Sequence, residues 1–177
     1  AYRIAAGDIV GNIVYYQNGL LTEEKPCMIA GLDYNTPWTR DTAINIWNAL
    51  SILSPEVSKN TLLAVLEEEE GNIYIGGQYW DSIIWMIGAR EYCRFHKDDN
   101  FYRLAFEAGR NSVHRLEEDE FDEEDGLFRG PAVYGDGIAA YPDKYSKCPN
   151  QGSGILEWVD YPGNPVYPKG YGIPMKA

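Results

Sequence analysis

Residues 36–56, TPWTRDTAINIWNALSILSPE, contain the start of one helix, its amphipathic body and the start of a second helix. Thr36 is a suitable N-cap residue, and Pro37 suits the first helical position because its missing N–H would have had no partner there. Large apolar residues then recur at helical spacing: Ile44, Trp47, Leu50 and Leu53. Ser54-Pro55 repeats the cap-then-proline pattern. The stretch therefore predicts a helix over residues 37–53 followed at once by another.

The same apolar periodicity predicts helices on both sides of this stretch. We expect them over residues 2–16, from 55 to just before Gly71, over 79–96 and from 98 or 99 to about 116. A hairpin around Asn18-Gly19 is the alternative for the end of the first helix. The acids Glu67 to Glu70 would then occupy a helix C-terminus.

The pattern changes after residue 141, where prolines alternate with glycines and tyrosines. Such a composition is typical of a long irregular segment and not of a helix. Strand signals are confined to short pieces such as Ile73-Tyr74-Ile75. The sequence therefore predicts an all-α fold, with a helical-hairpin domain over residues 1–145 and an irregular tail or cavity-covering loop over 146–177.

Length and composition limit the function classes. A chain of 177 residues with 45% hydrophobic residues has room for one domain with a core, or for part of a larger one. The net charge of −12 argues against nucleic acid or an anionic membrane surface as a partner. No apolar run of 18 residues is present, so we expect no transmembrane helix. The sequence does not indicate a cellular compartment.

Several sites can be excluded by spacing. The three cysteines show no metal-ligand spacing, and His96 and His114 lie on different predicted helices. Aligning Gly126 with the sixth position of a calcium loop places Phe121 and Ala132 where carboxylates are required. We expect neither a metal nor a cofactor, and the acidic tract 117–125 is better explained as a solvated helix end.

Three side chains near the start of the helix over residues 37–53 have the chemistry of a sugar site. Trp38, Arg40 and Asp41 place an aromatic ring, a fork of donors and an acceptor-only carboxylate close together. These are the groups that hold a neutral, hydroxyl-rich ligand. The alternative is a capped helix with a surface ion pair between Arg40 and Asp41.

Two further places carry similar chemistry. Trp80 and Asp81 start the most apolar helix, where they could stack on and hydrogen-bond a ligand, or serve as core and cap. Asp136 is flanked by glycines and lies beside Tyr134. A carboxylate there is a reasonable general acid if ligand binding dries its surroundings and raises its pKa. The alternative is that Asp136 only forms a turn.

Over residues 34–145, these segments together resemble the six-hairpin glycosidases, a group that includes glucoamylases, glycogen-debranching glucosidases and glycoside hydrolase family 63. The residues concerned are Trp38-Thr39-Arg40-Asp41, Gln78-Tyr79-Trp80-Asp81 and the Asp-Gly-Leu-Phe-x-Gly stretch over 125–130 that leads to Asp136. The resemblance implies an (α/α)6 toroid. Twelve helices of roughly 20 residues each would need well over 200 residues, so the toroid would be incomplete in this chain.

The resemblance also implies a function, namely hydrolysis of an α-linked sugar with inversion. Arg40 and Asp41 would hold the sugar at the non-reducing end, and Asp136 would protonate the leaving oxygen. The pocket would be lined by Trp38, Trp80 and Tyr134. The substrate would be an oligosaccharide or glycoside.

An inverting hydrolase also needs a catalytic base to activate its water. In the group, the base usually comes from a later hairpin that this chain lacks. Glu157, beside Trp158, is the one late acid in a promising setting. If Glu157 is not the base, the remainder of a larger catalytic domain would supply the base. The alternatives are a non-catalytic carbohydrate-binding or scaffold domain, and a glycan lyase or phosphorylase.

Overall fold

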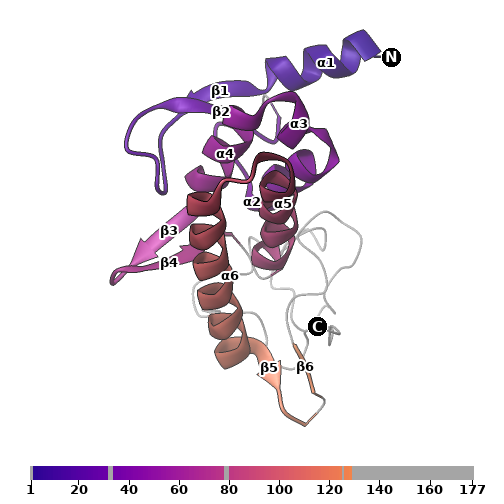
Figure 1. The fold of residues 1–177 in the computed structure, drawn as a ribbon. Coiled ribbons are helices and arrows are strands. Elements are labelled where there is room, and N and C mark those ends of the chain that lie inside the picture. The colour runs from indigo at the N-terminus through magenta and orange to yellow at the C-terminus, as the bar shows by residue number, and fades with distance from the viewer. Residues whose placement is uncertain (1, 32–33, 78–79, 125, 129–177) are drawn as a thin grey trace, which may run out of the picture. The chain divides into compact units, whose positions relative to one another are not determined.

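A computed structural model of the chain describes residues 2–31, 34–77, 80–124 and 126–128 (Figure 1). The chain divides into two compact units, residues 1–115 and residues 116–177. The domain boundary predicted between residues 145 and 146 lies outside the described residues.

In the described part, groups of helices are separated by pairs of short strands. The helices are α1 (Tyr2–Gly11), α2 (Thr39–Asn45), α3 (Ser51–Leu53), α4 (Pro55–Ala64), α5 (Asp81–His96) and α6 (Asp99–Glu120), and a π-helical segment, η1 (Ile46–Leu50), joins α2 to α3. The strands are β1 (Ile13–Tyr16), β2 (Lys25–Met28), β3 (Leu66–Glu69), β4 (Asn72–Ile75), β5 (Phe121–Asp122) and β6 (Leu127–Phe128). They pair as three separate antiparallel hairpins, β1–β2, β3–β4 and β5–β6.

Helices α2 and α5 pack closely and run in the same direction. A Cβ atom on Gly88 would lie only 2.8 Å from the Cα of Ala43, so the two backbones are in contact there. Beyond α2, in α3, the carbonyl oxygen of Ser51 accepts a hydrogen bond from His96 Nε2 at the end of α5 over 2.5 Å. Since residue numbers rise together along the contact, the helices are parallel and their N-terminal ends lie at the same end of the pair.

Each of these two helices has an antiparallel partner. Helix α4 turns back along α2 after Ser54, and α6 turns back along α5 (Figure 1). The rings of Tyr92 and Phe101 are 5.1 Å apart near the α5–α6 turn. Further from the turn, Met86 fills the space beside Gly109, where an added Cβ would lie 2.7 Å from its Sδ. The first unit is therefore built on two helical hairpins.

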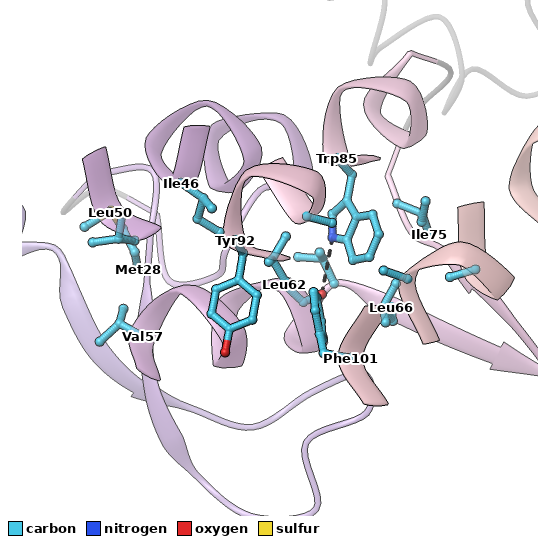
Figure 2. Packing of buried hydrophobic residues seen from close by; sticks show 14 residues of the cluster. Met28, Ile46, Leu50, Val57, Leu62, Leu66, Ile75, Trp85, Tyr92 and Phe101 are labelled. Atoms are coloured by element: carbon cyan, nitrogen blue, oxygen red, sulfur yellow. Dashed lines mark hydrogen bonds between the residues drawn. The ribbon is translucent and has the colours of Figure 1, made fainter. Parts of the chain in front are cut away.

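The core forms where these helices face one another (Figure 2). Trp85 of α5 is fully buried, and its indole Nε1 donates a hydrogen bond to the carbonyl oxygen of Leu62 in α4 over 3.3 Å. Phe101 packs against Trp85 from α6, with ring centroids 6.4 Å apart. Leu66 and Ile75 add buried side chains from the β3–β4 hairpin. The β3–β4 hairpin is therefore packed against the helices through this core.

The predicted all-α fold is wrong, because the described residues form a mixed fold with three β-hairpins. Glu67 to Glu70 were expected at a helix C-terminus. Instead, Glu67, Glu68 and Glu69 lie in β3 and pair with residues of β4, and Glu70 begins the turn. Glu70 and Gly71 both have positive φ, at 51° and 81°, as a two-residue hairpin turn requires. Arg115 then holds the hairpin, since it pairs with Glu69 at 2.6 Å and lies 3.5 Å from the Tyr74 ring centroid.

The helix predicted over residues 2–16 is also too long. Helix α1 ends at Gly11, and residues 13–16 form β1, so the hairpin alternative around Asn18-Gly19 is the better description. The sequence of β1, Ile-Val-Tyr-Tyr, is rich in β-branched and aromatic residues, which fit a pleated sheet. Its partner β2 brings the buried Cys27 opposite Val14.

The predicted helix starts have mixed outcomes. The α4 start at Ser54-Pro55 is confirmed, and so is the Asp98 cap of α6, whose Oδ1 accepts the Phe101 N–H over 3.0 Å. The cap at Thr36 is wrong, because α2 begins at Thr39 with Trp38 in the N-cap position. The Thr36 hydroxyl instead lies 2.9 Å from the Tyr16 hydroxyl.

Replacing Gly88 with alanine should destabilise the protein. The new methyl group would clash with the backbone of Ala43, so α2 and α5 would have to separate, at a cost of about 1–3 kcal/mol in the free energy of unfolding. Urea denaturation followed by far-UV circular dichroism measures this. Gly7→Ala is the matched control. No atom lies within 4 Å of a Cβ at Gly7 in α1, so there the change should be neutral or stabilising.

The Asp98 carboxylate should make stability depend on pH. Its ion pair with Lys59 and the Phe101 N–H lower the pKa of Asp98 below its ordinary value of 3.8. A depressed folded-state pKa stabilises the protein above about pH 4, and this stabilisation is lost as the pH falls through the folded pKa. Asp98→Asn keeps a capping oxygen but removes the charge, so its loss of stability should be larger at pH 6 than at pH 2.5 in parallel urea titrations. An equal loss at both values would contradict this.

Candidate functional site at the paired starts of α2 and α5

The first residues of α2 and α5 meet at one glycine. Thr39 Oγ1 donates a hydrogen bond to the carbonyl oxygen of Gly76 over 2.8 Å. A Cβ on Gly77 would lie 2.9 Å from Thr39 Oγ1 and 2.7 Å from Asp81 Oδ2. Gly77 also has a φ of +113°, which side-chain-bearing residues rarely adopt. The starts of both helices therefore pack against the loop that follows β4.

Trp38 enters α2 with an extended backbone, at φ −100° and ψ 134°. Its carbonyl oxygen accepts the Thr42 N–H over 2.8 Å, which closes the first helical turn. The edge of Tyr34 meets the Trp38 ring, with centroids 5.9 Å apart and an interplanar angle of 79°. The indole Nε1 of Trp38 is buried and has no hydrogen-bond acceptor among the described residues.

Arg40 and Asp41 follow in the first turn of α2, and both side chains are half-buried. A carboxylate in the first turn is stabilised by the helix dipole. Within the described ranges, Asp41 has no ion-pair partner, so the alternative of a surface Arg40–Asp41 pair is not observed.

Trp80 and Asp81 begin α5 at the same end of the helix pair. The Trp80 carbonyl oxygen accepts the Ile84 N–H over 3.0 Å, and the Trp80 side chain is half-buried. Asp81 is the first residue of α5 and is only 4% exposed. Its carboxylate thus lies at the positive end of a 16-residue helix.

The structure therefore brings together two of the predicted segments, residues 38–41 and 80–81. Asp136, Tyr134 and Glu157 lie outside the described residues. Their predicted roles as general acid, pocket lining and base stay predictions.

Two residues that organise this site were missed in the sequence. Thr39 lay inside the predicted motif, but its hydrogen bond to the loop before α5 is a tertiary contact that spacing does not reveal. Gly77 could have been noticed, because a Gly-Gly pair four residues before a helix marks a backbone that can approach other groups closely.

Metal and thiol chemistry find no support in the described part of the chain. No group of three His, Cys, Asp or Glu side chains in those residues could hold a metal ion. Burial raises the pKa of the Cys27 thiol to about 11, and burial also raises the pKa of Cys93. Both thiols are therefore protonated and weakly nucleophilic at neutral pH.

Comparisons with known proteins give no relatives for this chain. No protein-family model, no curated protein and no solved structure matches it. Among the described residues, no helix is both long and apolar enough to cross a membrane. The residues at the paired helix starts are therefore the evidence for a function.

Replacing Thr39 with valine should loosen the contact between the two helix starts. Valine has nearly the same shape but cannot donate to the Gly76 carbonyl oxygen, so we expect a loss of about 1–2 kcal/mol in the free energy of unfolding. Urea denaturation measures the loss. Thr39→Ser keeps the hydroxyl and should lose less, and an equal loss in the two variants would show that the hydrogen bond contributes nothing.

Proposed function

We propose that the paired starts of α2 and α5 bind a neutral carbohydrate and that the protein hydrolyses an α-linked glycosidic bond there. The supporting observation is that Thr39 and Asp81 both lie against Gly77, because this places the two predicted sugar-binding segments side by side. Without this contact, residues 38–41 and 80–81 would be two unrelated helix ends.

The binding chemistry follows from the groups at the two helix starts. Sugar hydroxyls both donate and accept hydrogen bonds. The Asp41 carboxylate accepts two or more, the Arg40 guanidinium donates several, and the buried Trp38 indole N–H needs an acceptor. The half-buried ring of Trp80 adds an apolar surface of the kind that packs against the C–H face of a sugar.

The hydrolytic step rests on the resemblance to six-hairpin glycosidases in the order and spacing of the motifs. Asp136 would protonate the leaving oxygen, with its pKa raised when the bound sugar excludes water. Glu157, or the remainder of a larger catalytic domain, would deprotonate the attacking water from the opposite face of the sugar ring.

A second candidate is a carbohydrate-binding domain without catalysis. It is favoured by the chemistry of the residues at the helix starts, which suits holding a sugar and includes neither of the proposed proton-transfer groups, Asp136 and Glu157. The two candidates differ in one observable: only the hydrolase releases reducing ends.

The decisive experiment combines sugar binding with turnover. A panel of α-linked glucose disaccharides is titrated calorimetrically against the wild-type chain and the Asp41→Ala and Asp136→Asn variants, and reducing ends are assayed in parallel. Asp41→Ala should weaken binding at least about tenfold, because a charge-assisted hydrogen bond is lost. Asp136→Asn should abolish turnover and keep binding.

The exposed acid Asp99, far along the chain from the site, provides the matched control. Asp99→Ala should bind and hydrolyse like the wild type. Unchanged binding in Asp41→Ala would exclude the site, and wild-type turnover in Asp136→Asn would exclude that residue as the acid. Binding by the wild type with no release of reducing ends would favour the non-catalytic domain.

A further inference from the structure

Helices α2 and α5 expose large apolar side chains that their packing leaves uncovered. Trp47 is 53% exposed and Ile44 is 40% exposed, while Ile83 and Ile87 of α5 are 36% and 39% exposed. Ile83 and Ile87 are one helical turn apart, so they lie on the same face of α5. Their arrangement is a stripe and not a scatter of single residues.

The exposed residues of the two helices lie on the same side of the helix pair. Ala43 and Gly88 mark where the helices touch, and Ile46 and Trp85 point from this line into the core. Helical spacing places the exposed residues on the opposite side of both helices. We call this surface the outer face of α2 and α5; it is formed by Ile44 of α2, Trp47 of the adjoining η1, and Ile83, Ile87 and Phe95 of α5.

The size of the outer face suits a protein–protein contact. Five large side chains, each 36–53% exposed, leave on the order of 400 Å² of apolar surface open to water. That lies within the range of the largest patch on a typical monomer, which is often functional. A standard interface buries about 800 Å² per partner, of which roughly 57% is apolar. The outer face thus matches the apolar part of one side of a stable dimer.

The charge around the outer face is compatible with a second copy of the same chain as the partner. The chain has a net charge of −12, which repels like molecules at most orientations. The segments 39–53 and 81–96 are balanced, with three acids and three arginines: Asp41, Asp81, Glu91, Arg40, Arg90 and Arg94. The exposed glutamates of β3 and the acids near the end of α6 lie outside these segments. Two copies can therefore approach through this face without strong repulsion.

We propose that two copies of the chain associate through the outer face of α2 and α5, related by a two-fold axis. In such an isologous contact the same residues serve both copies, so apolar side chains meet apolar side chains. Association buries Trp47, Ile83 and Ile87 in both partners. It does not depend on sugar binding at the helix starts.

Sedimentation velocity of the purified 177-residue chain tests this, over protein concentrations of about 1–100 µM. The wild type should shift with concentration toward twice the mass of the 20.0 kDa chain. Ile87→Lys should raise the dissociation constant of the dimer at least tenfold, because each dimer contains the change twice. Position 87 is exposed in the single chain, so its circular dichroism melt should stay unchanged.

Phe106→Lys is the matched control, since Phe106 is an exposed apolar residue of α6 outside the outer face. It should dimerise like the wild type. A wild type that stays monomeric at every concentration overturns the proposal, as does a dimer that Ile87→Lys leaves intact or that both variants weaken equally. If Ile87→Lys melts at a lower temperature, Ile83→Lys on the same stripe replaces it, with the same expected result.

Discussion

The close approach of α2 and α5 at Ala43 and Gly88 is the contact on which the other features of the first unit depend. It is possible only because Gly88 has no side chain, which lets two helix backbones touch. Once they touch in parallel, the start of α2 must lie beside the start of α5. Thr39 and Asp81 can then share the space around Gly77, and Trp85 is directed toward Leu62 on the core side.

Parallel packing also has an electrostatic consequence. It places the positive ends of two helix dipoles at the same place, where they repel each other unless negative groups lie nearby. Asp41 and Asp81 each occupy the first turn of one of these helices. These carboxylates stabilise the helix ends, and in the proposed function Asp41 also accepts hydrogen bonds from ligand hydroxyls. Asp41 can therefore serve both the fold and the proposed sugar site.

Some local signals in the sequence predicted local structure correctly. Ser54-Pro55 and Asp98 define helix starts within a few residues of themselves, so the sequence alone was sufficient. The strand signal at Ile73-Tyr74-Ile75 corresponds to β4, but β3 was missed because a run of glutamates has a good helical propensity and its strand conformation depends on pairing with β4 and on Arg115. Likewise, residues 38–41 and 80–81 could be predicted as separate motifs, whereas their meeting at Gly77 is a tertiary fact.

The apolar pattern of α5 shows what periodicity can and cannot decide. Its apolar residues were recognised, but the pattern did not tell which of them face the core. Trp85 and Tyr92 do, whereas Ile83, Ile87 and Phe95 do not. A surface helix typically has one apolar stripe that faces the core, with polar residues on the opposite side. The width of the apolar pattern in α5, beyond what one core needs, is therefore itself a reason to expect a second contact surface on this helix.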